Sequence, residues 1–454
     1  MRTSPVPARK SGRASRQSPP DPSPRGGPSN AAAPSADDRY QLFAVTAPGL
    51  EPLAERELRA IGIANPRAET GGVAFAGRAE HLYRANLWLR TASRVVARMG
   101  EFHATTFRDL EREARLLPWE RFVTKGAPVR FRVTCRKSKL YHSDAVAERL
   151  VGALAHRLGA TPAVEMVGAS EEQGDDDGGG ERDEGSGGAG AQLFTARFLH
   201  DRCTVSADSS GALLHLRGYR QAVGKAPLRE TLAAAVLLAA EWDGTTPLVD
   251  PLCGSGTLAI EGALIARRMA PGARRHFAFM HWPGYDQAVW RSMLEKAEAG
   301  ALAAAPVPIL ASDRDAGATA AAAANAERAG VAADVAVSTR ALSHAEPPTT
   351  GAAGLVASNP PYGVRVGDQD RLRNLYAQLG KLLDARFAGW RVALLSADRV
   401  LEGQTGVGLH EALRTSNGGI PVRIMVGVAG SADREAGARG RKADVAVEDA
   451  GRPG

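Results

Sequence analysis

The residues best suited to chemistry stand together in Asn359-Pro360-Pro361-Tyr362, directly after an apolar run and Ser358. Two consecutive prolines fix the backbone, so the carbonyl of Pro360 and the side-chain oxygen of Asn359 can aim at one point. Two such acceptors can hold an exocyclic amino group and keep its lone pair from delocalising into a ring. Tyr362 can stack on the base that carries the amine. The segment therefore predicts chemistry on a base amine, and a plain Pro-Pro turn is the alternative.

A glycine-rich loop forms a second candidate site. The segment Asp250-Pro251-Leu252-Cys253-Gly254-Ser255-Gly256-Thr257 follows an apolar run, and a helical pattern begins beside Gly256. Gly254 and Gly256 let backbone amides approach a ligand above the carboxyl end of a strand. With Ala259 the loop matches G-x-G-x-x-A, which taken alone indicates a dinucleotide.

A dinucleotide site expects an acid about 20 residues further on, at the end of the second strand. That interval holds Arg267 and Arg268, and the first acid at a predicted strand end is Asp313. The Asp313 carboxylate could accept both hydroxyls of a ribose, whichever nucleoside is bound. Asp250 could orient an amino group beside the glycine loop, or it could simply form a turn before Pro251.

These loops require a sheet whose strands end at one edge. From about Ser206 onward, short apolar runs alternate with helical patterns. We expect strands at 248–252, 307–311, 335–337, 354–357 and 392–395, and helices over 256–269, 316–329 and 372–387. This alternation predicts an α/β domain over 206–429 with a doubly wound, Rossmann-like and mostly parallel sheet.

Two small α+β modules are predicted ahead of this domain. The first, 39–105, combines strands at 40–47 and 73–75 with helices over 50–61 and 82–96. The second, 106–205, places strands at 129–135 and 193–198 around a helix over 143–158.

Charge is distributed unevenly along the chain. Residues 1–38 hold eight prolines and a net charge of +3, so we expect a disordered basic arm, and 430–454 is expected to be a disordered tail. Residues 168–191 carry nine glycines and a net charge of −7, which indicates a flexible acidic insertion. The net charge of the whole chain is +7, so the residues outside the arm and the insertion carry a net charge of +11. That balance fits a polyanionic partner or a solvated surface.

The segment 121–139 concentrates this positive charge. It contains seven Lys and Arg residues and no acid, with Phe131 inside it and Tyr141 just beyond it. An edge strand protected by charge is one reading. The other is a nucleic-acid surface, with phosphate contacts from Arg130, Arg132, Arg136, Lys137 and Lys139.

Composition and spacing argue against several classes of protein. No apolar run approaches the roughly 20 residues of a membrane span, and 1–38 lacks the apolar core of a secretory signal. Cys135, Cys203 and Cys253 lie too far apart for a CxxC site, and the ten histidines form no HExxH pattern. We therefore expect a cytoplasmic protein with no membrane and no metal, in which Cys253 is a packing residue and not a nucleophile.

Taken together, the glycine loop, Asp313 and Asn359–Tyr362 resemble class I S-adenosylmethionine-dependent methyltransferases that act on amino groups. From about Tyr40 to Gly427 the chain also resembles the THUMP-domain RNA methyltransferases, and among them the bacterial branch that makes N2-methylguanosine in 23S rRNA. The segments that carry this resemblance are APGLE (47–51), ETGGVAF (69–75), ANLWLRTASRV (85–95), LPWE (117–120), KSKLYH (137–142), RGYR (217–220), APLRETLA (226–233) and LYAQLG (375–380).

The resemblance implies a ferredoxin-like module, a THUMP module that grips RNA and a catalytic domain, in this order. It implies methyl transfer to guanine N2, with rRNA as the substrate and tRNA as an alternative. An adenine-N6 methyltransferase and a non-catalytic RNA-binding factor of ribosome assembly are further alternatives, and an oxidoreductase would instead bind NAD. The expected S-adenosyl-L-methionine contacts are Asp250, Pro251, Cys253, Gly254, Gly256, Thr257, Asp313 and Asn359, and the expected catalytic residues are Asn359, Pro360, Pro361 and Tyr362.

Overall fold

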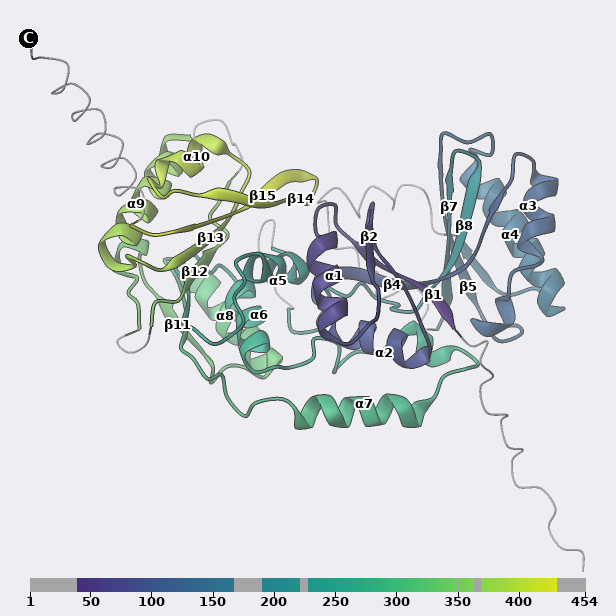
Figure 1. The fold of residues 1–454 in the computed structure, drawn as a ribbon, viewed down its shortest axis with the longest axis horizontal. Coiled ribbons are helices and arrows are strands. Elements are labelled where there is room, and N and C mark those ends of the chain that lie inside the picture. The colour runs from purple at the N-terminus through teal and green to yellow at the C-terminus, as the bar shows by residue number, and fades with distance from the viewer. Residues whose placement is uncertain (1–38, 167–189, 221–227, 349–351, 363–368, 431–454) are drawn as a thin grey trace, which may run out of the picture. The chain divides into compact units, whose positions relative to one another are not determined.

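The computed structural model describes residues 39–166, 190–220, 228–348, 352–362 and 369–430 (Figure 1). The predicted basic arm 1–38, nearly all of the acidic insertion 168–191 and nearly all of the tail 430–454 lie outside these residues. The described residues belong to one unit that is built on two sheets. Within these ranges no helix is long and apolar enough to cross a membrane.

The first sheet contains strands from both predicted N-terminal modules. Its eight strands lie in the order β2-β3-β1-β4-β8-β7-β5-β6. They are β1 (Tyr40–Thr46), β2 (Arg67–Glu69), β3 (Gly72–Gly77), β4 (Ala92–His103), β5 (Val129–Arg136), β6 (Val164–Met166), β7 (Gln192–Leu199) and β8 (Arg202–Asp208). The long strand β4 joins the two halves, because it pairs with β1 on one side and with β8 on the other. Strand β8 continues to Asp208, past the predicted boundary at residue 205.

Four helices accompany this sheet: α1 (Glu51–Ala60), α2 (Ala79–Trp88), α3 (Phe107–Ala114) and α4 (Ser143–Leu158). Helix α4 has the predicted bounds. The predicted helix over 82–96 is wrong in its second half, because α2 ends at Trp88 and β4 begins at Ala92. Val95 and Val96 are both buried, which a strand achieves by placing neighbours on opposite faces. Their β-branched side chains favour the same outcome.

The second sheet confirms the predicted mostly parallel arrangement. Its order is β11-β10-β9-β12-β13-β15-β14, and the first five strands in that order are parallel neighbours. They are β9 (Leu248–Asp250), β10 (Ile309–Asp313), β11 (Val335–Thr339), β12 (Leu355–Ser358) and β13 (Arg391–Ser396). The remaining two, β14 (His410–Asn417) and β15 (Ile420–Val428), form an antiparallel hairpin, and β15 pairs with β13.

Helices cover both faces of the second sheet (Figure 1). On one face, α5 (Glu230–Ala239), α6 (Thr257–Ala266) and α8 (Ala316–Ala329) share a core with Leu248. On the other face, α9 (Gln369–Arg386) packs against Val249, with α10 (Arg399–Gln404) beside α9. The two cores meet at neighbouring residues of β9, as the alternation of side chains along a strand requires.

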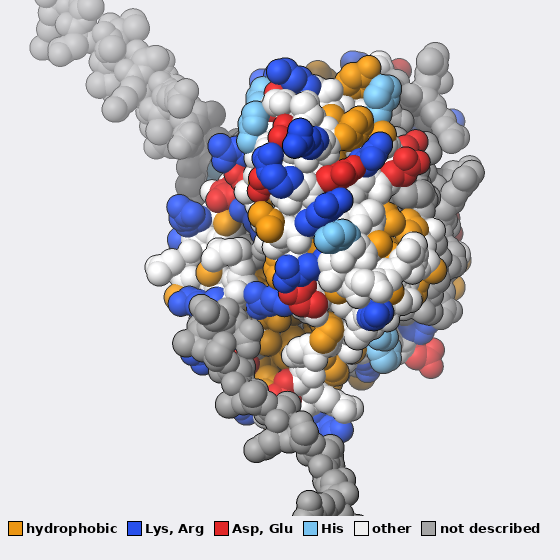
Figure 2. All heavy atoms as spheres, turned by 90° about the vertical axis from the view of Figure 1, so that its right-hand side faces the viewer, with side chains coloured by type: hydrophobic (Ala, Val, Ile, Leu, Met, Phe, Trp, Pro, Cys, Tyr) orange, Lys and Arg blue, Asp and Glu red, His pale blue; other side chains and the backbone are white. Residues whose placement is uncertain are grey.

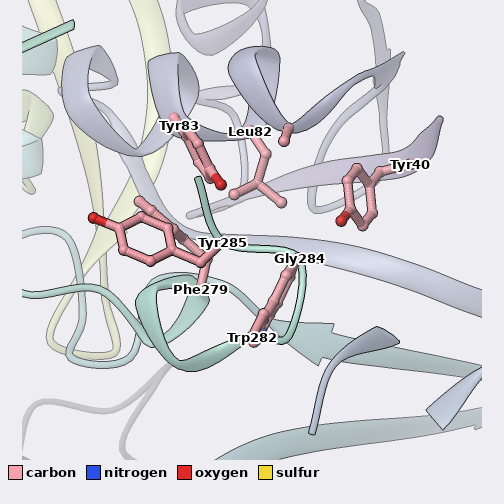
Figure 3. Close-up of a pocket in the computed structure, with 8 residues that line it drawn as sticks. Tyr40, Leu82, Tyr83, Phe279, Trp282, Gly284 and Tyr285 are labelled. Carbon is pink, nitrogen blue, oxygen red and sulfur yellow. The ribbon is translucent and has the colours of Figure 1, made fainter. Parts of the chain in front are cut away.

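Between α6 and β10 the chain leaves the second sheet and packs against the first module. Helix α7 (Gln287–Ala299) lies beside α2 (Figure 1). A cluster of aromatic side chains holds this segment against the first module. Tyr83 stacks on Phe279 with ring centroids 4.6 Å apart, and Trp282 and Tyr285 complete the cluster in Figure 3. The space among these rings does not admit a water molecule, so the cluster is a packing contact and not a binding pocket.

A buried group of charges fastens the first module to α6. Arg90 donates to the backbone carbonyl of Met269 at 2.7 Å and lies 3.9 Å from the Glu261 carboxylate. Glu261 also lies 3.6 Å from Arg217 and accepts a hydrogen bond from the Tyr219 hydroxyl at 3.1 Å. Because α6 begins directly after the glycine loop, this cluster sets the position of the first module against that loop.

Gly49, in the loop between β1 and α1, marks a second contact between the two sheets. Its φ is +86°, and a Cβ atom there would lie 1.8 Å from the backbone carbonyl oxygen of Arg414 in β14. The loop can therefore reach the hairpin only because residue 49 has no side chain.

Gly49→Ala should lower the free energy of unfolding by about 3 kcal/mol or more, because alanine must keep a left-handed φ while the backbone moves away from Arg414. Gly71→Ala is the matched control, since Gly71 has a φ of +84° and no atom within 4 Å of its Cβ position. Only the conformational cost of about 1–2 kcal/mol should remain there. Urea unfolding of both variants measures the difference, and equal losses would contradict the close contact.

Candidate active site

The glycine loop follows β9, which lies between β10 and β12 in the sheet. Gly254 and Gly256 have φ values of +50° and +84°, a region that favours glycine. A Cβ atom on Gly256 would lie 2.8 Å from the Cβ of Ala322 in α8, whereas no atom lies within 4 Å of that position on Gly254. Gly256 thus permits α6 and α8 to pack closely, and Gly254 borders open space at the end of the strand.

Asp313, the last residue of β10, is bonded to this loop. One carboxylate oxygen accepts from the backbone N–H of Gly254 at 3.0 Å, and the other accepts from the N–H of Asp315 at 3.0 Å. Each carboxylate oxygen can accept more than one hydrogen bond. The side chain is therefore anchored and can still receive the hydroxyls of a ribose.

A buried hydrogen bond links the glycine loop to the segment after β12. The Ser358 hydroxyl donates to Oδ1 of Asp250 at 2.9 Å, and the backbone N–H of Leu252 donates to the same oxygen at 3.2 Å. Asp250 and Ser358 are both almost completely buried. The sequence patterns indicate no role for Ser358, and the structure shows that it joins the two predicted sites.

Burial also sets the acidity of the groups in the loop. It raises the pKa of Asp250 to about 7, against the lowering effect of the hydrogen bonds from Ser358 and Leu252, and the nearby Asp313 carboxylate raises that pKa further. Burial raises the pKa of the Cys253 thiol well above its ordinary value. A buried thiol with a raised pKa is a poor nucleophile.

Asn359 carries an unsatisfied buried acceptor. Its Oδ1 atom is buried and has no hydrogen-bond partner among the residues that the structure describes. The next residue, Pro360, is buried, and Pro361 is exposed. Leaving such an oxygen without a donor costs about 1–3 kcal/mol, so it calls for an explanation beyond folding. A ligand with an amino group would supply the missing donor.

Tyr362 is held by a residue that sequence reasoning missed. Its hydroxyl oxygen accepts a hydrogen bond from Nδ2 of Asn417 at 2.6 Å. Burial raises the pKa of Tyr362, so its hydroxyl stays protonated at neutral pH. Asn417 ends β14 and is followed by Gly418 and Gly419. An Asn-Gly-Gly sequence between two extended runs is typical of a hairpin turn, and this signal could have revealed the element.

The predicted phosphate-contacting residues lie on β5 and in the loop after it. Arg136, Lys137 and Lys139 are exposed, and the N–H of Lys139 donates to the Asp201 carboxylate at 2.6 Å, which braces the loop. Phe131, which lies among these charges in the sequence, is only 1% exposed and belongs to the core. Figure 2 shows the face at this end of the first sheet, where Lys and Arg side chains are spread with acidic ones among them. The other two predicted phosphate-contacting residues, Arg130 and Arg132, are half-buried on β5.

Two family models match the chain. The model of an RMKL-like methyltransferase domain matches residues 217–420, and the model of an RlmL ferredoxin-like domain matches residues 41–96.

Similar proteins extend over most of the chain. A Synechocystis protein named as an RNA methyltransferase is 34% identical over 388 residues, which cover 84% of this chain and 95% of the relative. The ribosomal RNA large subunit methyltransferase K/L of Methylococcus capsulatus is 36% identical over 398 residues, 85% of this chain and 50% of the relative. The protein of that name from Syntrophotalea carbinolica is 36% identical over 404 residues, which cover 86% of this chain and 53% of the relative. The chain thus spans about half the length of these K/L relatives.

Solved structures resemble the whole arrangement. SMU.472, which is described as a methyltransferase and was crystallised with SAH, has a TM-score of 0.74 and 29% identity, and the match covers 87% of this chain and 99% of that one. A Listeria monocytogenes protein described as an N6-adenine-specific DNA methylase has a TM-score of 0.72 and 31% identity, covering 85% and 96%.

Asp250→Asn should change the pH dependence of stability. Between the ordinary pKa of 3.8 and the folded-state pKa of about 7, the folded protein holds a proton that the unfolded chain releases, so this group makes stability fall as pH rises. Asparagine cannot ionise. The free energy of unfolding of the variant, relative to the wild type, should therefore rise by up to about 1.4 kcal/mol per pH unit across this interval.

Denaturant titrations of both proteins at several pH values measure this difference. Asp243→Asn is the control, because the hydrogen bond from Thr245 lowers the pKa of Asp243 below its ordinary 3.8. Its effect on stability therefore changes with pH near and below 3.8, with the opposite sign, and should stay nearly constant over most of the interval up to pH 7. A difference between Asp250→Asn and wild type that stays constant with pH would contradict the raised pKa.

Proposed function

Because the chain belongs to the RMKL-like methyltransferase family, we propose that it transfers a methyl group from S-adenosylmethionine to the exocyclic N2 of a guanosine in 23S rRNA. The observation that carries this proposal is the buried Oδ1 of Asn359, which has no donor among the described residues. Asn359 directly follows Ser358, whose hydroxyl donates a hydrogen bond to the carboxylate of Asp250 at the start of the glycine loop.

The residues around the loop fit S-adenosylmethionine, which is the cofactor and supplies a methyl group already activated on a sulfonium. Open space borders Gly254, and the first turn of α6 presents backbone N–H groups beside it. The Asp313 carboxylate, bonded to Gly254, would receive the ribose hydroxyls. The further residues proposed to hold the cofactor are Asp250, Pro251, Cys253, Gly256, Thr257 and Asn359.

The chain would act by positioning. The side-chain oxygen of Asn359 and the carbonyl of Pro360 would accept both N–H groups of the amine and direct its lone pair at the methyl group. Pro361 would stiffen this turn, and the ring of Tyr362 would stack on the flipped base. The amine proton becomes acidic only as the N–C bond forms, so solvent can take it and no strong base is needed.

The N-terminal half supports an RNA substrate. Residues 41–96 match the RlmL ferredoxin-like model. We propose residues 106–205 as a THUMP module that grips RNA through the exposed loop at Arg136–Lys139. The names of the K/L relatives favour rRNA over tRNA.

An adenine-N6 methyltransferase is the second candidate. Two converging acceptors serve either amine, and one similar structure is described as an adenine-specific methylase. A non-catalytic ribosome-assembly factor would need neither the cofactor loop nor an unsatisfied acceptor.

Asn359→Ala should reduce methyl transfer by about a hundredfold or more, because the amine loses an acceptor that fixes its lone pair. Binding of S-adenosylmethionine, measured by titration calorimetry, should be weakened but not lost, because the other proposed contacts to the cofactor remain. In a strain that lacks the gene, the wild-type chain should restore N2-methylguanosine in rRNA and the variant should not.

Four results would point elsewhere. Full activity of Asn359→Ala would refute the site. Restored N2-methylguanosine in tRNA, or restored N6-methyladenosine, would replace the proposed substrate. A wild-type chain without heat of S-adenosylmethionine binding would favour the assembly factor.

Lys137→Ala combined with Lys139→Ala should weaken RNA binding without regard to sequence. The slope of log K against log salt should become shallower by about 0.7–0.9 for each lost phosphate contact. Lys381→Ala, at an exposed position on α9, is the control and should leave the slope unchanged. Filter binding of rRNA fragments across a salt series measures the slope, and a slope shared by all proteins would remove this loop from the RNA interface.

A further inference from the structure

We propose that Asn417, at the tip of the β14–β15 hairpin, is a positioning residue of the methyl-transfer site: it orients the ring of Tyr362 for stacking on the target base. The inference rests on the proposed function and adds to it an element that lies outside both motif loops. The hairpin belongs to the far edge of the second sheet, beyond β13.

The contact itself is short and partly buried. Nδ2 of Asn417 donates to the hydroxyl oxygen of Tyr362 at 2.6 Å, across 55 positions of sequence. Both residues are half-buried, and the Tyr362 ring packs on the edge of the core that contains Val422 and Ile424 of β15. Among the described residues, Asn417 supplies the one side-chain hydrogen bond recorded for Tyr362. The ring is thus held at its outer end by the hairpin and at its inner end by the rigid Pro360-Pro361 backbone.

The hairpin is built to hold Asn417 in a fixed place. Asn417 pairs directly with Ile420, and the two residues between them, Gly418 and Gly419, have φ values of +59° and +76°. Positive φ at both positions is the geometry of a type I′ turn, whose twist matches that of the strands. Strand β15 is in turn paired with β13 from Arg423 to Val428, which anchors the base of the hairpin. Asn417 therefore moves only if the hairpin moves with it.

The same hairpin touches the first module. The carbonyl oxygen of Arg414 in β14 lies where a side chain on residue 49 would have to stand, in the loop after β1. Hence the strand that carries Asn417 contacts the half of the chain that we propose binds RNA. Strand β14 thus contacts the first module at Arg414 and Tyr362 at Asn417.

A double-mutant cycle tests the proposal with purified full-length chain, radiolabelled S-adenosylmethionine and rRNA. Asn417→Ala and Tyr362→Phe each remove the same hydrogen bond, so each should lower kcat/KM for RNA by roughly three- to tenfold. The double variant should be no slower than the slower single variant, since the bond can be lost only once. The Kd for S-adenosylmethionine should not change in any of them.

Two further variants separate positioning from structural damage. Asn417→Asp offers a carboxylate that can accept from the Tyr362 hydroxyl, so it should recover part of the rate with Tyr362 present and none in the Tyr362→Phe background. Ser416→Ala, one residue away on the same strand, should behave as wild type.

Multiplied losses in the double variant, a wild-type rate for Asn417→Ala, or an equal loss for Ser416→Ala would each overturn the inference. An inactive wild type would overturn the proposed function itself, and the inference with it.

Discussion

The hydrogen bond from the Ser358 hydroxyl to the Asp250 carboxylate sets the spacing on which the candidate site depends. The two residues end β12 and β9, which are direct parallel neighbours, so the loops that follow them leave the sheet side by side. Parallel pairing alone brings both loops to one edge. The buried bond adds a fixed distance between them. Burial raises the pKa of Asp250 despite this bond, so the geometry is maintained against an electrostatic cost.

A second constraint connects that edge to the first module. Buried ion clusters such as Arg90, Arg217 and Glu261 seldom add much net stability, because desolvation offsets their attraction, yet breaking one is costly. Their effect is to select one arrangement of the parts that they join. Glu261 stands one turn into α6, so the helix that begins at the glycine loop also receives the docking contact. RNA held by the second module, whose strand β8 pairs with β4 of the first, would thus be presented to the loop in a defined orientation.

The sequence predicted what is encoded locally. Five strands of the second sheet, helix α8 with its bounds and both motif loops follow from short apolar runs, glycines and a Pro-Pro pair that act on their own backbone. The first half of β4, which was predicted as helix, was beyond such reasoning, because its place in the sheet comes from pairing with the distant strand β1. The role of Asn417 is equally non-local, since its partner Tyr362 stands 55 positions away. Ser358 was visible in the sequence, but only the neighbouring strand end gives it a partner.

Asn359 and Asn417 both lie at strand ends, but they differ in hydrogen bonding. This difference distinguishes an amide that is satisfied within the fold from one that is left for a ligand. The amide of Asn417 is used by Tyr362, whereas the buried oxygen of Asn359 has no donor among the described residues. For folding alone an apolar residue at position 359 would be better, because an unmet buried acceptor costs about 1–3 kcal/mol. Residues that lower the stability of the fold are expected at functional sites, where a bound ligand satisfies them. The missing donor at Asn359 therefore supports the role that we propose for it, in which an amino group of the substrate supplies that donor.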